Sequence, residues 1–269
     1  LLTKIGDDLF AQFALERWRQ AGIDLSYVVK TSRAGTSFSS VFLHDSGMWT
    51  ATTYLGANEL LTFEDVQQYF AQLKESPPRI VHLGGYNKLT YFIGDPAKKV
   101  LRFIKDTGAL VAFDVVWDPK GWHEDRVKAI RETIRYTDVC LFNQNEAMTV
   151  AGGKELTKTA ENLLKLGPKI VAIKLGEQGS FIATENEMFK ASAFSVKVED
   201  SCGAGDAFNA GFIYGLLNSW DLRRTATFAN AIGAMKAAYV PRGWAFHWEV
   251  TRKQIDEFLQ KHSLETLDS

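Results

Sequence analysis

The sequence has few cysteines and few histidines. Its 269 residues include only two cysteines, Cys140 and Cys202, and five histidines that are scattered along the chain. Two cysteines cannot form a disulfide framework, and a reducing compartment is the default for such a chain, so we expect a cytoplasmic protein. The scattered histidines do not have the spacing of zinc ligands. These absences argue against the disulfide-rich and zinc-stabilised classes of protein.

The sequence also has no excess of either charge and no long apolar run. It contains 31 Lys and Arg residues against 32 Asp and Glu residues, which gives a net charge of −1. A nucleic acid or an anionic membrane would favour a basic surface, so neither is an expected partner. No apolar stretch approaches the roughly 20 residues of a membrane span, and no signal peptide is visible.

Apolar residues make up 46% of the chain, which is enough for a substantial core and is inconsistent with disorder. From about residue 62 onward, predicted strands and helices alternate. This alternation predicts a three-layer, Rossmann-like α/β fold, in which a mostly parallel sheet is covered by helices on both faces. Ligands of such sheets bind beyond the carboxyl ends of the strands. The predicted strands are Ile80–Leu83, which is expected to be buried, Leu110–Phe113, Val139–Phe142 and Ile170–Lys174.

The residues before this alternation have a different character. Residues 6–21 predict a helix with apolar side chains available for burial, namely Leu9, Phe10, Phe13, Leu15 and Trp18. Residues 36–54 are rich in Ser, Thr and aromatic residues and contain a turn signal, so they predict a hairpin. Little apolar surface accompanies this hairpin, and we expect one of its faces to be half exposed. An ordinary edge hairpin and a covering flap are both open interpretations.

The strongest local signal lies late in the chain, where a glycine-rich loop runs into a predicted helix. Gly203 and Gly205 give the backbone freedom to approach a ligand closely. The first turn of the helix directs unpaired N–H groups and the positive end of the helix dipole out of this loop, an arrangement that binds anions. Asp206 lies in that turn, where a carboxylate can take a proton from a hydroxyl that attacks a bound phosphate. For these residues alone, a structural explanation is the stronger one, because Asp in a first turn complements the dipole.

The same helix has small residues at every fourth position, namely Ala207, Gly211 and Gly215. This spacing places them on one face of the helix. We therefore expect the helix to pack very close to a neighbour.

The loop and helix carry a resemblance to a known family. The segment Asp200-Ser201-Cys202-Gly203-Ala204-Gly205-Asp206-Ala207-Phe208 resembles the C-terminal signature of the ribokinase-like (PfkB) carbohydrate kinases, usually Asp-Thr-x-Gly-Ala-Gly-Asp-x-Phe. Ser201 is the one departure, and it keeps the hydroxyl of Thr. Because the motif is long and specific, it reverses the preference for a purely structural explanation.

The resemblance implies an ATP-dependent kinase that phosphorylates a hydroxyl of a small sugar or sugar derivative. Asp206 would be the general base and would contact the substrate, and the N–H groups of Gly203, Ala204 and Gly205 would form the anion hole. A nucleoside kinase of the same superfamily is the alternative within this class. From a different class, the alternative is a catalytically silent regulator that binds a sugar or nucleotide. The intact Asp206 and Glu146 argue against that regulator.

Further motifs resemble the nucleotide site of the family. Asn143-Gln144-Asn145-Glu146 matches its Asn-x-x-Glu motif, which implies that Glu146 holds Mg²⁺ through water and that Asn143 contacts phosphate. A role in capping a helix is equally open for this motif. The segment from Lys174 to Ser180 resembles the Gly-x-x-Gly turn that lies along ATP, although it is also an ordinary hairpin turn. The further ATP contacts that the resemblance implies are Lys174, Gly176, Gly179, Asn230 and Gly243.

The resemblance also implies a substrate site and a cation site. Asp114 lies in a segment that resembles the family's Asp-Pro segment near the sugar and the phosphate, and Gly85 follows the preceding strand, so both are assigned to the substrate. Asp200, which begins the signature, corresponds to a residue that holds K⁺ in many relatives. We therefore expect a modest activation by K⁺ over Na⁺.

The resemblance divides the chain into a start of the core over residues 1–25, a β lid over residues 26–56, and the α/β core over residues 57–269. Gly6-Asp7-Asp8-Leu9-Phe10 resembles the family's Gly-x-Asp-x-Phe segment. In the family this segment follows a first strand, a sugar-binding Asp and a Gly-Gly-x-x-x-Asn motif. The printed sequence contains none of these, so we expect the natural protein to have a further N-terminal part. The resemblance leaves open a homodimer formed through the lid.

Overall fold

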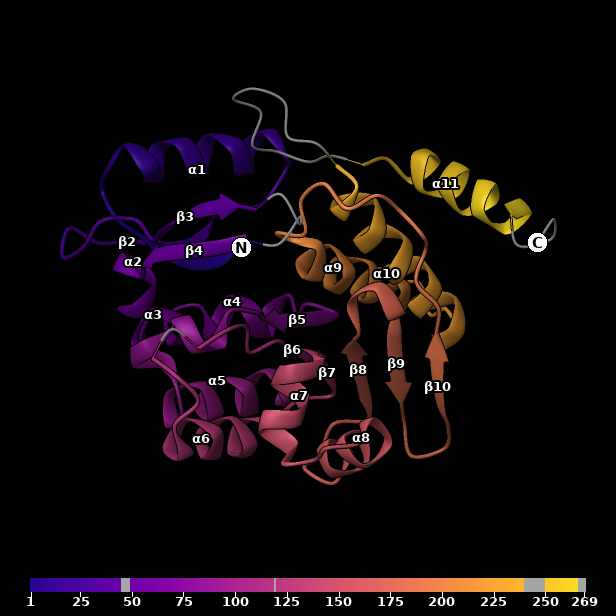
Figure 1. Cartoon of the computed structure of the whole chain (residues 1–269). Helices are drawn as coiled ribbons and strands as arrows, with labels where there is room; N and C mark the ends of the chain where they lie inside the picture. Colours follow the sequence, from indigo (N-terminus) through magenta and orange to yellow (C-terminus); the bar gives the residue numbers. More distant parts are fainter. Residues whose placement is uncertain (45–48, 119, 240–249, 266–269) are drawn as a thin grey trace. The chain divides into compact units, whose positions relative to one another are not determined.

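The computed structural model describes residues 1–44, 49–118, 120–239 and 250–265. The chain forms two compact units (Figure 1). None of the helices within the described residues is long and apolar enough to cross a membrane. The first unit comprises Leu1–Ser40 with Ala51–Lys169, and the second comprises Val41–Thr50 with Ile170–Ser269.

Three parallel strands form the centre of the first unit. They are β5 (Ile80–Leu83), β6 (Leu110–Phe113) and β7 (Val139–Asn143), and β6 pairs in parallel with both β5 and β7. Residues 111–113 of β6 are fully buried. Strand β7 is buried over residues 139–142, and the sequences of β6 and β7 are the nearly continuous apolar runs of strands that are buried on both faces. The prediction that β5 is a buried strand is wrong, because three of its residues are only partly buried and His82 is exposed.

Helices and short turns connect and cover these strands. In α5 (Asp95–Asp106), Pro96 lies in the first turn, where its missing N–H costs nothing, and Gly108 follows the last turn. The helix buries one apolar stripe and packs against β6 and α6. The other elements here are η1 (Tyr86–Lys88), η2 (Thr90–Phe92), α6 (Glu124–Ile134), α7 (Gln144–Ala151) and α8 (Leu156–Leu164).

The N-terminal part of the first unit begins with a second, smaller sheet. Strand β1 (Leu2–Ile5) pairs in parallel with β2 (Tyr27–Lys30), and α1 (Leu9–Gln20) connects them. The predicted hairpin is confirmed as the separate two-stranded sheet of β3 (Phe38–Leu43) and β4 (Trp49–Tyr54). Three short helices lead from it towards β5, namely α2 (Gly56–Glu59), α3 (Phe63–Gln67) and α4 (Phe70–Glu75).

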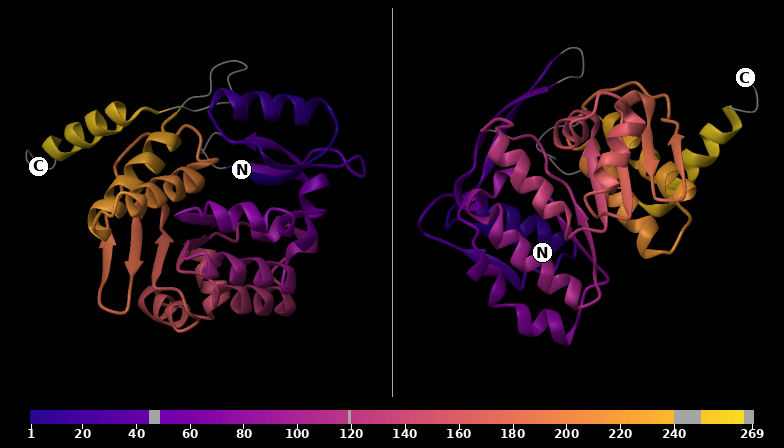
Figure 2. Two further views of the ribbon diagram at one scale, coloured as in Figure 1. Left: turned by 180° about the vertical axis from the view of Figure 1, so that it is seen from behind. Right: turned by 90° about the horizontal axis from the view of Figure 1, so that it is seen from below.

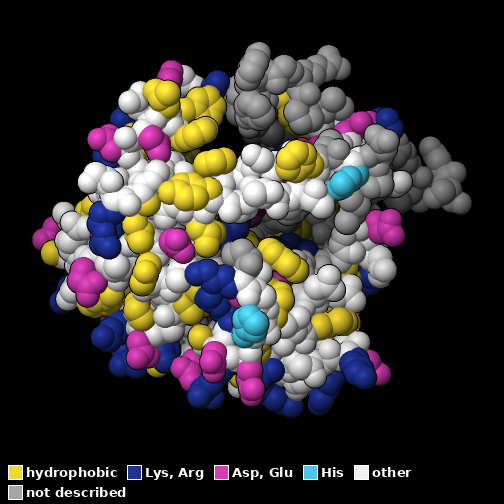
Figure 3. Space-filling model, turned by 60° about the vertical axis from the view of Figure 1, so that its left-hand side comes forward, with side chains coloured by type: hydrophobic (Ala, Val, Ile, Leu, Met, Phe, Trp, Pro, Cys, Tyr) yellow, Lys and Arg dark blue, Asp and Glu magenta, His cyan; other side chains and the backbone are white. Residues whose placement is uncertain are grey.

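The predicted burial of apolar side chains in α1 is confirmed for Leu15 and is wrong for Leu9, Phe10 and Phe13. Leu9 is 79% exposed, and both phenylalanines are about half exposed. Helix α1 buries Ala11 together with Leu15, four residues further along, and both pack in one cluster with residues of β1 and β2. The larger apolar side chains therefore reach the surface, and Figure 3 shows hydrophobic side chains at the surface of one face of the molecule.

Asp8 fixes the beginning of α1 to the segment before the hairpin. Its Oδ1 accepts hydrogen bonds from the Ala11 N–H at 2.8 Å and the Thr36 hydroxyl at 2.8 Å, and its Oδ2 accepts one from the Thr36 N–H at 2.7 Å. The Thr36 N–H, followed by the Ala11 N–H, lowers the pKa of the Asp8 carboxyl. The carboxylate is therefore both a helix cap and a clamp on a distant loop.

The Asp8→Ala variant should melt a few degrees below the wild type at pH 7. Because the pKa of Asp8 is lower in the folded than in the unfolded chain, its stabilisation is present above about pH 4 and is lost as the pH falls through the folded pKa. Thermal melting between pH 7 and pH 2 should therefore show the two proteins converging in acid. Asp7→Ala is the control, because Asp7 is exposed. A difference in melting temperature that persists unchanged to pH 2 would contradict the ionic clamp.

Within its described residues, the second unit contains three antiparallel strands and three helices, together with the end of the β3–β4 hairpin. Strands β8 (Ile170–Lys174), β9 (Ser180–Ala183) and β10 (Met188–Ala191) pair in sequence order, and η3 (Gly176–Gln178) joins β8 to β9. Both pairings are antiparallel, and for β8 and β9 this agrees with the hairpin turn that the sequence predicted between Lys174 and Ser180. The helices are α9 (Ala204–Leu217), α10 (Leu222–Ala237) and α11 (Arg252–Glu265).

The prediction of close packing by the glycine helix is confirmed. Figures 1 and 2 show α9 and α10 side by side. A methyl group added at Gly211 would lie 2.9 Å from the Ala229 Cα, and one added at Gly215 would lie 2.6 Å from the Thr225 hydroxyl oxygen. Because the two backbones approach this closely, α10 fixes the position of α9 and of the loop before it.

Candidate active site

The glycine-rich loop ends in the left-handed conformation that its sequence favours. Gly203 has φ +79°, and α9 begins at the next residue, Ala204. The N–H groups of a first helical turn have no partner inside the helix. One of them is used in the turn itself, because the Ala204 N–H donates to the Ser201 carbonyl at 3.2 Å. Asp206, the third residue of the helix, is exposed.

The beginning of the loop is attached to the end of α10. The Asp200 N–H donates to the Ala237 carbonyl at 3.1 Å, and the Asp200 Oδ1 accepts the Cys202 N–H at 2.9 Å. The Asp200 Oδ2 lies 3.3 Å from the Lys236 Nζ, so the carboxylate predicted to hold K⁺ has an ammonium group as its partner.

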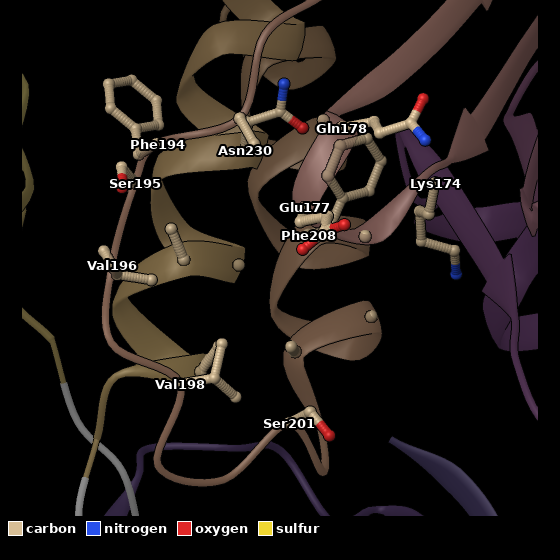
Figure 4. Close-up of a pocket in the computed structure, with 18 residues that line it drawn as sticks. Lys174, Glu177, Gln178, Phe194, Ser195, Val196, Val198, Ser201, Phe208 and Asn230 are labelled. Atoms are coloured by element: carbon tan, nitrogen blue, oxygen red, sulfur yellow. The ribbon is translucent and has the colours of Figure 1, made fainter. Parts of the chain in front are cut away.

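A cavity of about 880 Å³ lies within the second unit (Figure 4). Its size is that of a site for a small molecule or nucleotide. The loop after β10 contributes Val196 and Val198, and α9 contributes the Phe208 ring, so much of the wall is apolar. Six of the residues predicted from the sequence line this one cavity: Lys174, Gly176, Gly179, Ala204, Gly205 and Asn230.

The turn between β8 and β9 requires glycine at its end. Gly179 has φ +87°, and its carbonyl accepts the Leu175 N–H at 2.8 Å. A methyl group at Gly179 would lie 2.1 Å from the Ala191 carbonyl oxygen. The turn can therefore lie against the end of β10 only because this residue has no side chain.

Asn230 has the partners that a buried amide on an apolar helix needs. Its Nδ2 donates to the Ala191 carbonyl at 3.1 Å and to the Ser192 carbonyl at 3.0 Å. Figure 4 shows its amide oxygen turned towards the side of Phe208. Asn230 thus attaches the end of β10 to α10, and the same side chain lines the cavity.

Lys174 places a positive charge beside the first turn of α9. Its Nζ donates to the Asn209 Oδ1 at 3.1 Å and lies 3.7 Å from the position of a methyl group on Gly205. Asn209 lies in α9 and is 1% exposed. The ammonium group and the positive end of the helix dipole therefore act at the same wall of the cavity.

Sequence reasoning missed Asn209 and Lys236. Asn209 lies one position after the signature, and Lys236 is a single lysine in the last turn of an apolar helix, where a cation ordinarily complements the dipole. The signal for Asn209 was available, because a polar amide between buried residues needs a partner.

Asn143 and Glu146 form a reciprocal helix cap in the first unit. The Asn143 Oδ1 accepts the Glu146 N–H at 2.9 Å, and the Glu146 Oε2 accepts the Asn143 N–H at 2.8 Å. Glu146 is buried. The capping role that the sequence left open is therefore confirmed, while the role in Mg²⁺ binding stays a prediction.

Asp114 and Gly85 lie at the carboxyl ends of neighbouring strands in the first unit. Gly85 has φ +70° and follows β5, and the next residue, Tyr86, donates its N–H to the Asp114 carbonyl at 3.4 Å. Asp114 is buried, and its Oδ1 accepts the Val116 N–H at 3.0 Å. The pair therefore occupies the edge at which such sheets bind ligands.

Not every predicted residue belongs to the same unit. Asn143, Glu146, Asp114 and Gly85 belong to the first unit, whereas the cavity lies wholly in the second. Gly243 lies outside the described residues. Within the part of the chain that the structure describes, no group of three or more His, Cys, Asp or Glu side chains could by itself hold a metal ion.

Several known proteins are similar to this chain in sequence. The sequence profile described as pfkB family carbohydrate kinase matches residues 1–240. The 5-dehydro-2-deoxygluconokinase of Clostridium perfringens is 29% identical over 245 residues, which cover 88% of this chain and 72% of that protein. The ribokinase of Staphylococcus aureus is 29% identical over 251 residues, which cover 87% of this chain and 74% of that protein.

Solved structures share the fold. A putative ribokinase II from E. coli matches with a TM-score of 0.83 and 22% identity, over 97% of this chain and 83% of that one. A structure of a putative ribokinase II from E. coli in complex with ATP and Mg²⁺ matches with a TM-score of 0.82 and 22% identity, over 97% of this chain and 82% of that one. The predicted ribokinase-like α/β fold with a mostly parallel central sheet is confirmed. The chain belongs to the pfkB family of carbohydrate kinases, and it is an enzyme that transfers a phosphate group from ATP to a sugar.

Proposed function

We propose that the cavity in the second unit binds ATP and that Asp206 is the general base of the phosphate transfer. The observation that carries this proposal is the convergence of three features on one cavity. These are the first turn of α9, the Lys174 ammonium beside Gly205, and the turn closed by Gly179. Backbone N–H groups at a helix N-terminus and a lysine are the groups that bind phosphate.

In the proposed reaction, Asp206 accepts the proton of the sugar hydroxyl. The oxygen of that hydroxyl attacks the γ-phosphorus of ATP, and ADP leaves. The helix N-terminus and Lys174 stabilise the charge that develops on the transferred group. Gly203 and Gly205 contribute N–H groups to the anion hole. The N–H of Ala204 contributes only if it leaves its bond to the Ser201 carbonyl.

For the metal, we propose that Glu146 holds a water ligand of Mg²⁺. Bound Mg²⁺ neutralises charge on the nucleotide phosphates, and an acidic oxygen is the kind of group that holds its waters. The cap formed with Asn143 supports this proposal, because it holds the Glu146 carboxylate at the carboxyl end of β7. Asn143 is proposed to contact phosphate.

The Glu146→Gln variant should need about tenfold more Mg²⁺ for half-maximal activity and should turn over more slowly, because a group outside the metal's own ligands is worth about 10–100-fold in affinity. Gln also serves at this position of a capping box, so the melting temperature should stay close to that of the wild type. Mg²⁺ titrations at saturating ATP measure the effect. Glu161→Gln, on helix α8, is the control. An unchanged Mg²⁺ requirement would remove Glu146 from the metal site.

The acceptor is proposed to be a small sugar or sugar derivative, with Asp114 and Gly85 contacting it. The relatives named above act, by their names, on 5-dehydro-2-deoxygluconate and ribose, so sugar acids and pentoses are the first substrates to try. The experiment is ADP production by the full-length natural protein across ketoses, aldoses, sugar acids and nucleosides. We expect turnover with a sugar or sugar acid. Turnover with nucleosides alone would make the protein a nucleoside kinase, and ATP binding without any turnover would make it a regulator.

We also propose a cytoplasmic homodimer formed through the β lid of residues 26–56. Three partly exposed aromatic rings support this proposal: the Phe10 and Phe38 rings stack with centroids 5.0 Å apart, and the Phe38 and Tyr54 centroids are 5.8 Å apart. Exposed apolar clusters of this kind favour association. Sedimentation of the natural protein measures its oligomeric state, and a monomer at micromolar concentration would refute the dimer.

A K⁺ ion at Asp200, which the resemblance implies, fits the described residues poorly. The Lys236 ammonium already contacts this carboxylate. A second cation beside the first would be repelled by it.

A further inference from the structure

A lysine and an aspartate from separate elements meet beneath the glycine-rich loop. The Lys236 Nζ lies 3.3 Å from the Asp200 Oδ2, and the two side chains are only 15% and 17% exposed. The Lys236 Cε lies 3.6 Å from the position of a methyl group on Gly203. The lysine therefore contacts the first residue of the loop, and its side chain runs close to the left-handed glycine.

The Lys236–Asp200 pair is shielded from water, so it should contribute more to the conformation of the loop than an exposed ion pair does. Exposed pairs contribute little, whereas the loss of one partner of a shielded pair leaves an uncompensated charge. The other Asp200 oxygen holds the Cys202 N–H, so this carboxylate also shapes the turn that leads into α9. A bare carboxylate at this place would repel a phosphate at the nearby helix N-terminus, and the ammonium removes that repulsion.

We propose that Lys236 takes the place of a bound monovalent cation at this site. Its ammonium neutralises Asp200 and holds residues 200–203 in the conformation that presents the N-terminus of α9 to phosphate. Lys236 is a positioning residue, since it acts through the loop. This inference rests on the proposed function, because it concerns the anion hole that ATP would use.

The first measurement uses the wild type alone. ATP affinity by calorimetry, and ADP production with an accepted sugar, are compared in chloride salts of choline, Na⁺, K⁺ and NH₄⁺ at matched ionic strength. We expect values within twofold of one another in all four salts, because the cation is part of the chain. Activation of several-fold by K⁺ over Na⁺ would overturn the proposal.

The second measurement uses variants of Lys236, one of which lacks the ammonium group. Lys236→Met keeps the length of the side chain but not its charge, and it should weaken ATP binding by about 10–100-fold, the range expected for a charge-assisted contact. Adding K⁺ or NH₄⁺ should raise the ATP affinity of Lys236→Met at least fivefold, and choline should leave it unchanged. Lys236→Arg keeps the charge and should stay within about fivefold of the wild type without any salt effect.

The control is Lys253→Met, because Lys253 is a highly exposed lysine of α11. It should match the wild type in every salt. Unchanged ATP binding in Lys236→Met, or a loss that no cation restores, would overturn the proposal. ATP binding is measured without an acceptor, so a failure of the sugar panel refutes the proposed reaction and leaves this test intact.

Discussion

The Asp206→Asn variant should lose about 10²–10⁴-fold in kcat while its affinity for ATP stays the same or rises slightly. The substitution keeps the size of the side chain and much of its hydrogen bonding, and the exposed position in the first turn of α9 tolerates both residues. Losing the carboxylate removes repulsion of the nearby phosphate but also removes the group that accepts the proton. A loss in kcat with an unchanged Kd for ATP is the pattern of a group that acts mainly in the transition state.

The control is an aspartate of purely structural function. The Asp221 Oδ1 caps α10 by accepting the Arg224 N–H at 2.8 Å. Asp221→Ala should therefore lower the melting temperature and leave kcat nearly unchanged. Steady-state kinetics, calorimetry and thermal melting on both variants separate the two roles. Turnover by Asp206→Asn within threefold of the wild type, on a sugar that the wild type phosphorylates, would show that Asp206 is not the base.

The features that sequence reasoning predicted well are those with a local cause. A strand buried on both faces must be apolar along its length, so β6 and β7 could be identified from composition alone. The glycine-rich loop could be placed before α9 because few residues other than glycine adopt the φ of +79° found at Gly203. The spacing of Gly211 and Gly215 likewise predicted close packing, because a helix places every fourth residue on one face.

The features that it missed depend on contacts between distant parts of the chain. Lys236 and Asp200 are 36 positions apart, and Lys174 and Asn209 are 35 apart, so neither pair has a local pattern. The large apolar side chains at the start of α1 looked like core residues, but the smaller Ala11 faces the strands. Which face of an apolar helix is buried depends on the neighbour it meets, and the sequence of the helix does not specify that neighbour.

The Asn143–Glu146 motif could not be interpreted from the sequence for a different reason. Its pattern fits both a helix cap and a metal site, and the structure confirms the cap. The two roles use the same carboxylate, so the presence of one does not decide the other. Only a substitution that keeps the cap, such as Glu146→Gln, can separate them.

The second large effect is expected at Lys174. Lys174→Met should weaken ATP binding by about 10–100-fold and lower kcat by a similar factor, because a charged hydrogen bond to phosphate is worth about 1.5–3 kcal/mol and the charge on the phosphate grows in the transition state. Lys174 lines the cavity and lies beside Gly205, which is part of the proposed anion hole. Lys158→Met, on the exposed face of α8, is the matched control.

The Asn209→Ala variant shows whether this effect depends on position as well as charge. It keeps the Lys174 ammonium but removes the Asn209 oxygen that accepts from it at 3.1 Å, so the rotamer of the lysine loses one of its restraints. We expect a several-fold rise in KM for ATP with a smaller change in kcat, and calorimetry and steady-state kinetics measure both. If the two side chains act as one unit, the double variant should lose little more than Lys174→Met alone. Fully additive losses would mean that Asn209 serves the packing of α9 and does not position the lysine.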